Sequence, residues 1–130
     1  MPCATQNEIG LEEAEQLAKN GVRYVIEGAN MPTRPEAMNF FKANKIILGP
    51  AKAANAGGVA VSALEMAQNS MRYSWTKEEV DEKLKQIMQN IHAASKAASE
   101  KYGLGYDLVA GANIAGFEKV VAAMISQGIY

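Results

Sequence analysis

The hydrophobic pattern of the chain alternates between helical spacing and short apolar runs. Residues 11–20 place apolar side chains on one helical face and end in Asn20-Gly21, so they predict a short helix. Residues 22–27 crowd β-branched and aromatic residues between two glycines, which predicts a strand. Residues 46–50 predict a second strand that is apolar on both faces, as in a parallel sheet covered by helices on each side.

Four further helices are predicted around these strands. Two of them begin with a capping box, in which a threonine and a glutamate three positions later satisfy each other's backbone amides: Thr33 with Glu36, and Thr76 with Glu79. The four helices are expected to end near Ala43, Tyr73, Tyr102 and Gln127, and the second and fourth of them to begin near Ala56 and Asn113.

The order of helix, strand, helix, strand and then three helices predicts an α/β fold with a parallel sheet and a crossover helix. Two short strands are too few for a self-sufficient sheet. In addition, Met1-Pro2-Cys3 stands where the tail of a further strand would lie. We therefore interpret the chain as part of a larger α/β domain.

The charge balance indicates which binding partners are expected, and the cysteine count indicates which cellular compartment is expected. Thirteen basic against 14 acidic side chains give a formal charge of -1, so no basic face for nucleic acid is expected. The single cysteine, Cys3, excludes an internal disulfide and favours a reducing compartment. The first residues lack the features of a signal peptide, and apolar runs such as residues 56–64 are shorter than a membrane span. We expect a cytoplasmic protein without membrane contact.

Three polar segments, of which the second and third contain glycine, are expected at one sheet edge: residues 2–8, 27–32 and 52–59. Ligands bind at the carboxyl ends of parallel strands in such folds. Glycines in the third segment let a backbone approach a ligand closely, although a glycine-eased helix contact explains them equally well. Ser62 lies one turn further on, and Asn30 can bond an amide, a ribose hydroxyl or a carboxylate, or simply form a turn before Pro32.

Other residues with reactive side chains favour structural roles. His92 has no histidine or cysteine partner for a metal, so we expect it to lie on a helix surface or in a packing contact, with no metal site. Cys3 lacks a nearby histidine and is interpreted as a small buried residue. Lys52 suits either an anion contact or a solvated loop. The triplet Gly-Ala-Asn at residues 28–30 and 111–113 is interpreted as two similar turns that lead into helices.

Five sequence blocks together resemble glutamate dehydrogenase of the bacterial and protist type, in order and across essentially the whole chain. The blocks are residues 2–8, 27–32, 52–59, 64–69 and 111–117. The resemblance is to the carboxy-terminal part of that enzyme. It implies the C-terminal part of a Rossmann-like, doubly wound dinucleotide-binding domain over residues 1–72, with two or three short parallel strands, followed by long C-terminal helices over residues 76–130.

The resemblance also implies a reaction and a set of site residues. The reaction is oxidative deamination of L-glutamate to 2-oxoglutarate and ammonia, with hydride transfer to NAD or NADP, in a homohexamer. Positions that match the coenzyme side are Ala4, Thr5, Asn30 and Asn55, and positions that match the substrate side are Asn55, Gly58, Val59 and Ser62. Ser62 matches the serine that binds the distal carboxylate of the substrate.

The resemblance also implies that two functional parts of the family's active site are missing from this sequence. The lysine and aspartate that transfer protons in the family belong to an amino-terminal part that this sequence does not contain, as does the glycine-rich dinucleotide fingerprint. We therefore expect no catalytic residue and no activity in this chain alone, with the amino-terminal part as its partner. Two alternatives stay open: a non-catalytic module that binds a nucleotide or a subunit, and a fragment of a related amino-acid dehydrogenase such as the leucine or phenylalanine enzyme.

Overall fold

A β–α–β unit forms the amino-terminal half of the molecule. The computed structural model describes residues 1–128. Helix α1 (Leu11–Lys19) leads to strand β1 (Tyr24–Ile26), and helix α2 (Pro35–Ala43) connects β1 to the parallel strand β2 (Ile47–Gly49). The register pairs Val25 with Leu48 at the centre of the two-stranded sheet. The predicted α/β class and the crossover helix are thus confirmed.

The core of this half lies between the sheet and the two helices. Phe41 and Ala37 of α2 and Ala14 of α1 are fully buried and pack with Val25 and Leu48. The opposite face of β1 carries exposed Tyr24 and Ile26. Within residues 1–128, helices therefore cover one face of β1. In β2, the strand for which we expected cover on both faces, Leu48 and Gly49 are buried and the strand contacts both α2 and α6.

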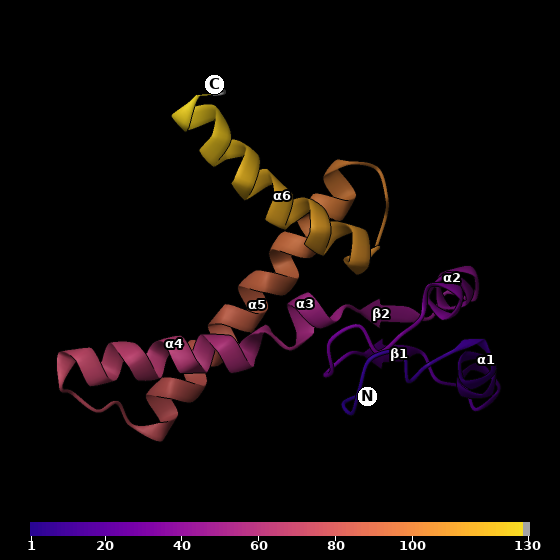
Figure 1. Ribbon diagram of the computed structural model, residues 1–130, viewed down its shortest axis with the longest axis horizontal. Coiled ribbons are helices and arrows are strands. Elements are labelled where there is room, and N and C mark those ends of the chain that lie inside the picture. Colours follow the sequence, from indigo (N-terminus) through magenta and orange to yellow (C-terminus); the bar gives the residue numbers. More distant parts are fainter. Residues whose placement is uncertain (129–130) are drawn as a thin grey trace.

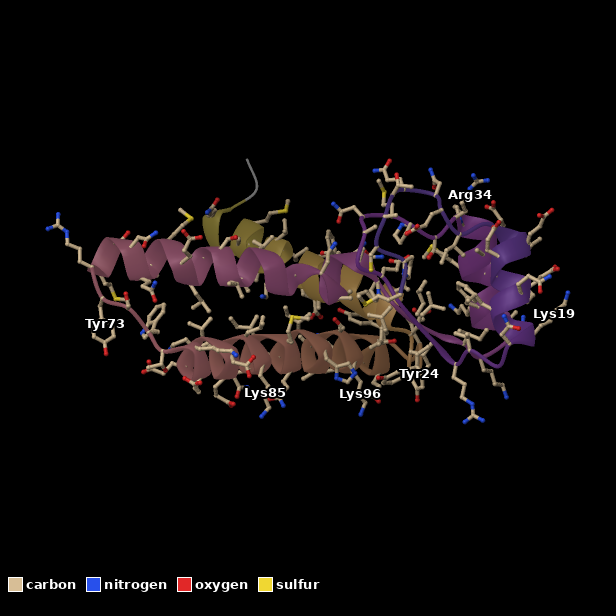
Figure 2. All side chains as sticks on the ribbon, turned by 90° about the horizontal axis from the view of Figure 1, so that it is seen from below. Lys19, Tyr24, Arg34, Tyr73, Lys85 and Lys96 are labelled. Carbon is tan, nitrogen blue, oxygen red and sulfur yellow. The ribbon has the colours of Figure 1, made fainter. Side chains whose placement is uncertain are left out.

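The second half is built from helices alone. A four-residue helix, α3 (Ala51–Ala54), is followed by α4 (Ala56–Met71), α5 (Lys77–Lys101) and α6 (Leu108–Gln127). Helix α5 packs against α4, which it crosses at an angle, and α6 crosses the far end of α5 (Figure 1). In Figure 2, Lys85 and Lys96 point from α5 away from α4.

Local signals set most helix ends as predicted. Glu79 Oε2 accepts from the Thr76 amide at 2.7 Å while Thr76 Oγ1 accepts from the Glu79 amide at 3.2 Å, so the capping box of α5 is confirmed. Helix α1 ends before Asn20 and Gly21, and Gly21 has a φ of 77°. Only a residue that tolerates the left-handed region can stop a helix in this way.

The same sequence pattern is misleading at α2. Arg34, not Thr33, is the N-cap residue of α2, and no side chain caps this helix. Thr33 instead forms an extended bridge with Ile9, and its hydroxyl is buried without a hydrogen-bond partner in residues 1–128. The predicted capping box at Thr33 and Glu36 is therefore wrong, because pairing with Ile9 holds Thr33 in an extended conformation.

Helix α6 begins five residues earlier than its predicted start at Asn113. Asp107 is the N-cap residue, and its Oδ1 accepts from the Ala110 amide at 3.0 Å. Gly111 consequently lies inside the helix, where it contacts α5, and the interpretation of residues 111–113 as a turn is wrong. Glycine serves here for close helix approach instead of for a turn.

Helix α6 also corrects an expectation about apolar length. By length and composition, it is the one helix in residues 1–128 that could cross a membrane. The expectation that every apolar run is too short overlooked it, because Glu118 and Lys119 interrupt the run at its centre. Glu118 forms an ion pair with Lys101 of α5, so the polar interruption faces a neighbouring helix.

We predict that replacing Asp107 by alanine destabilises the fold in a pH-dependent way. Burial works to raise the pKa of Asp107, but the Ala110 amide and the Lys42 ammonium group outweigh it and hold the pKa below its ordinary value of 3.8. A lowered folded-state pKa stabilises the protein above the unfolded-state value, and that stabilisation is lost as the pH falls through the folded-state value. The variant should lose about 1–2 kcal/mol at pH 7.

Urea unfolding between pH 7 and pH 2 measures this effect. The difference between Asp107→Ala and the unsubstituted chain should shrink as the pH drops below the ordinary carboxyl value. A Lys42→Met control removes the ion pair with Asp107 but keeps the helix cap. It should therefore cost less than Asp107→Ala. A loss that stays the same across the whole pH range would contradict the assignment.

Candidate functional site

Two of the three predicted segments meet at the carboxyl end of β1 through backbone hydrogen bonds. The Pro2 carbonyl accepts from the amides of Gly28 at 2.8 Å and Ala29 at 3.0 Å. Further along, the Asn7 amide donates to the Met31 carbonyl at 3.0 Å. The prediction that residues 2–8 and 27–32 lie together at one edge is confirmed.

Asn55 joins the third segment to this edge. Its side-chain Nδ2 donates to Asn30 Oδ1 at 2.8 Å and to the Gly28 carbonyl at 3.2 Å. Two asparagines that are 25 positions apart in the sequence are thus directly bonded. Within residues 1–128, no hydrogen bond reaches Asn55 Oδ1 or Asn30 Nδ2. The pair therefore leaves one acceptor, Asn55 Oδ1, and one donor, Asn30 Nδ2, for another partner.

The third segment is helical from its first residue, whereas we expected a helix to begin only near Ala56. Residues 51–54 form α3, Asn55 links it to α4, and Gly57 and Gly58 lie in the first turn of α4. A Cβ at Gly57 would meet Leu84 Cδ1 at 3.2 Å and Met88 Sδ at 3.4 Å. The alternative interpretation, a glycine that eases helix contact, is therefore the right one for Gly57.

One face of α4 continues the site beyond Asn55. Val59 and Ser62 follow Asn55 at intervals of four and three, so the three residues lie along the same stripe of the helix. Val59 is 75% exposed, Ser62 is exposed, and a Cβ at Gly58 would meet no atom within 4 Å. The stripe is a solvent-exposed surface that presents the side-chain amide of Asn55, the backbone of Gly58 and the hydroxyl of Ser62.

The amino-terminal segment lies at the surface of this edge. Ala4 and Thr5 are exposed, and the Ala4 amide donates to Glu8 Oε1 at 3.2 Å. Cys3 is exposed as well, which contradicts its interpretation as a small buried residue. Its Sγ lies 2.9 Å from the position of a Cβ on Gly28, so the thiol covers the glycine from outside.

The sequence analysis missed Glu27 as an individual residue. This carboxylate follows β1 directly, is 5% exposed, and accepts from the Ala51 amide at 2.7 Å through Oε2. It thereby connects the end of β1 to the start of α3. The signal in the sequence was a lone acidic residue at the end of an otherwise apolar strand.

Two other candidates take structural roles in the structure. Lys52 Nζ donates to Asn113 Oδ1 and so ties α3 to α6. His92 lies exposed on α5 with its Nε2 2.7 Å from the Tyr106 hydroxyl, which confirms its predicted place on a helix surface.

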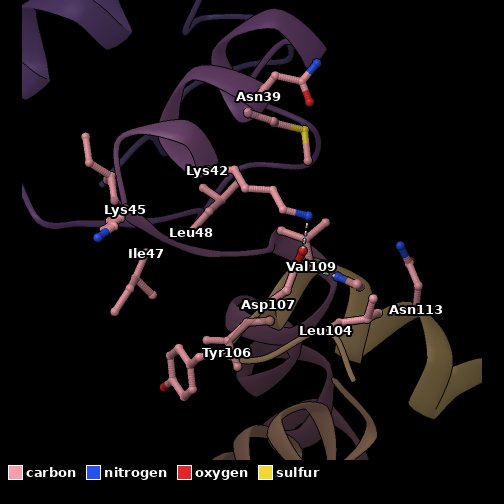
Figure 3. A pocket seen from close by; sticks show the side chains of 14 residues that line it. Asn39, Lys42, Lys45, Ile47, Leu48, Leu104, Tyr106, Asp107, Val109 and Asn113 are labelled. Atoms are coloured by element: carbon pink, nitrogen blue, oxygen red, sulfur yellow. Dashed lines mark hydrogen bonds and ion pairs between the residues drawn. The ribbon is translucent and has the colours of Figure 1, made fainter. Parts of the chain in front are cut away.

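A cavity of about 570 Å³ lies elsewhere, between α2, β2 and the start of α6. Figure 3 shows Lys42 reaching across it to Asp107, an ion pair of 2.8 Å. Neither Asn30, Asn55 nor Ser62 lines this cavity. The predicted site is thus an open surface at the end of β1.

Residues 1–128 match the family model described as glutamate/leucine/phenylalanine/valine dehydrogenase, and the chain belongs to this family of oxidoreductases. Within the family, the chain is similar to glutamate dehydrogenases. It is 58% identical over 130 residues to the NAD-specific enzyme of Clostridium symbiosum, in an alignment that covers 99% of the chain and 29% of that enzyme.

Two further comparisons agree. The NADP-specific glutamate dehydrogenase of Giardia intestinalis is 53% identical over 128 residues, which cover 98% of the chain and 28% of that enzyme. A crystal structure of Plasmodium falciparum glutamate dehydrogenase matches with a TM-score of 0.94 and 57% identity, over 99% of the chain and 28% of that protein. The chain therefore spans less than a third of the length of these relatives.

Proposed function

We propose that this chain is the carboxy-terminal part of an NAD- or NADP-dependent glutamate dehydrogenase and that it supplies one wall of the coenzyme and substrate cleft. The observation that carries the proposal is the Asn30–Asn55 pair at the carboxyl end of β1, continued by the exposed stripe of α4. Ligands bind at this end of the strands in doubly wound folds, which is how we interpret the sheet.

The asparagine pair fits the carboxamide group of a nicotinamide coenzyme. Asn55 Oδ1 and Asn30 Nδ2 are an acceptor and a donor on two directly bonded side chains, and a carboxamide offers the complementary donor and acceptor. When bound, such a coenzyme accepts a hydride. Ala4 and Thr5 are exposed in the segment whose Pro2 carbonyl accepts from Gly28 and Ala29, and we assign them to the ribose side. NAD- and NADP-specific relatives both support this class of coenzyme.

The stripe on α4 suits a substrate that ends in a carboxylate. Ser62 presents an exposed hydroxyl that can donate to an anionic oxygen, while Gly58 and Val59 leave open space above the first turn. An apolar side chain would gain nothing from that hydroxyl. This favours L-glutamate over leucine or phenylalanine as the substrate of the complete enzyme.

Helix α6 carries an exposed apolar surface that the remaining part of the enzyme could cover. Phe117, Val120 and Ile125 are 65%, 56% and 71% exposed on this helix. Apolar exposure of this kind marks a surface that another protein segment covers. We propose that the amino-terminal part of the same enzyme or another subunit of its homo-oligomer covers it. The cytoplasmic location belongs to the same proposal.

A chimeric enzyme tests the proposed function. In it, residues 1–128 of this chain replace the matching 29% of the Clostridium symbiosum enzyme. The chimera should reduce NAD in the presence of L-glutamate, because the chain then meets the missing wall of the cleft. A folded chimera that binds neither coenzyme nor glutamate would favour the non-catalytic module instead.

Ser62→Ala in the chimera should raise the KM for L-glutamate roughly tenfold or more, since a hydrogen bond to a charged group contributes about 1.5–3 kcal/mol. The KM for NAD should stay within twofold of that of the unsubstituted chimera. Ser70→Ala, an exposed serine near the end of α4, is the matched control and should change neither constant. An unchanged glutamate KM in Ser62→Ala would leave the related amino-acid dehydrogenases as the better assignment.

A further inference from the structure

Glu27 is a buried carboxylate whose described contacts all hold the end of β1 in place. Its backbone amide donates to the Gly49 carbonyl at 3.0 Å, and its Oε2 accepts from the Ala51 amide at 2.7 Å. It has no salt-bridge partner within residues 1–128. Burying a carboxylate is unfavourable unless strong hydrogen bonds compensate. The bond to Ala51 is therefore a principal interaction of this side chain.

The acceptor role of Glu27 determines where α3 begins. Helix α3 has only four residues, its N-cap residue is Pro50, and no side chain of its own caps it. A single helical turn is not stable by itself, because nucleation costs more than one hydrogen bond returns. Glu27 supplies the cap from outside the helix, so the position of α3 relative to β1 depends on this carboxylate.

Asn55 lies at the other end of the same turn. Its amide donates to the Ala51 carbonyl at 2.9 Å, and its side chain returns to Gly28 and Asn30. The side chain of Glu27 thus fixes the start of α3. The end of α3 in turn holds Asn55 against Gly28 and Asn30, which follow Glu27 in the sequence. A shift of α3 would separate Asn55 from Asn30.

We propose that Glu27 is a positioning residue that sets the geometry of the Asn30–Asn55 pair through the first amide of α3. The inference rests on the proposed function, since that pair is the proposed nicotinamide contact. Glu27 itself contacts the backbone of α3 and acts on the coenzyme only through Asn55. The length of its side chain and its acceptor oxygen, not its charge, are the properties that matter.

Two conservative variants separate these properties. Glu27→Gln keeps the length and an acceptor oxygen but removes the charge, whereas Glu27→Asp keeps the charge but is one methylene shorter and loses the reach to Ala51. In the 130-residue chain, NMR measures the hydrogen exchange of the Asn55 side-chain amide. Exchange should be at least tenfold faster in Glu27→Asp and within about twofold of the unsubstituted chain in Glu27→Gln.

The control variant removes a buried hydroxyl that forms no hydrogen bond within residues 1–128. Thr33→Val deletes the hydroxyl that has no partner in residues 1–128, and exchange at Asn55 should not change. Equal exchange at Asn55 in Glu27→Asp and the unsubstituted chain would overturn the proposal. So would a Glu27→Gln variant that loosens Asn55 as much as Glu27→Asp, because the acceptor would then be irrelevant.

The chimera gives a second readout that a purely structural role would not move. Glu27→Asp should raise the KM for NAD at least tenfold with kcat changed less than threefold, and Glu27→Gln should restore the KM. The positioning role would be overturned if both variants lowered kcat to a similar extent and left the KM for NAD unchanged. If the unsubstituted chimera does not turn over, the proposed function fails, while the exchange at Asn55 still decides the role of Glu27.

Discussion

Substituting Gly111 by alanine should lower the free energy of unfolding by about 3 kcal/mol or more, the upper range for overpacking a close contact. A Cβ at this position would lie 1.9 Å from the Ser95 carbonyl oxygen and 3.1 Å from Ser99 Cβ. The nearer atom belongs to the backbone of α5 and cannot rotate away. The two helices would have to separate, and the buried contacts between α5 and α6 would be lost.

Urea unfolding followed by circular dichroism measures this effect. Gly116→Ala is the matched control, because Gly116 lies in the same helix and a Cβ there would meet no atom within 4 Å. That control should stabilise the chain by roughly 0.5–1 kcal/mol through helix propensity. If Gly111→Ala unfolds at the same urea concentration as the unsubstituted chain, the close crossing of α5 and α6 is incorrect.

Asn55→Ala in the chimeric enzyme should lower kcat/KM for NAD about 100-fold. The substitution removes both side-chain bonds of Asn55, to Gly28 and to Asn30, together with its unpartnered acceptor oxygen. A displacement of about 1 Å at a reacting group can already cost 100-fold in rate. Initial-rate kinetics with varied NAD at saturating L-glutamate measures the loss.

A second asparagine on α4 provides the control for this variant. Asn69 is exposed, and within residues 1–128 its side chain bonds only Glu65 of its own helix, at 3.4 Å. Asn69→Ala should leave the kinetics of the chimera unchanged. An Asn55→Ala chimera that binds and turns over NAD as well as the Asn69→Ala chimera would remove the asparagine pair from the coenzyme site.

The contrast between two threonines shows what the sequence can predict about the fold. Thr76 and Glu79 interact within one helical turn, so the pattern alone predicts the start of α5. Thr33 begins the same pattern, but its backbone pairs with Ile9, which is 24 positions away in the sequence. A contact at that distance overrides a local preference and leaves no trace in the local pattern.

The site also contains features that the sequence pattern predicts and features that depend on contacts distant in the sequence. The arrangement of residues 2–8 and 27–32 at one edge followed from strand direction, and the structure confirms it. The helical state of residues 51–54 did not follow, because its cap comes from Glu27. Gly111 was interpreted as a turn residue for the same reason: the need for glycine arises from Ser95 on another helix.

The side chains at the proposed site are also expected to limit what this chain can do by itself. Oxidative deamination requires groups that accept and donate protons. The side chains that the structure brings together at the proposed coenzyme contact, Asn30 and Asn55, are neutral amides, and the nearby carboxylate of Glu27 is bonded to a backbone amide. We therefore expect the chain to contribute one wall of the proposed cleft and proton transfer to depend on residues outside it.

The most direct test is an assay of the purified 130-residue chain for reduction of NAD and NADP at saturating L-glutamate, with its helical content verified by circular dichroism. We expect no reduction above the rate without glutamate. Glutamate-dependent reduction of either coenzyme by the folded chain alone would contradict this expectation.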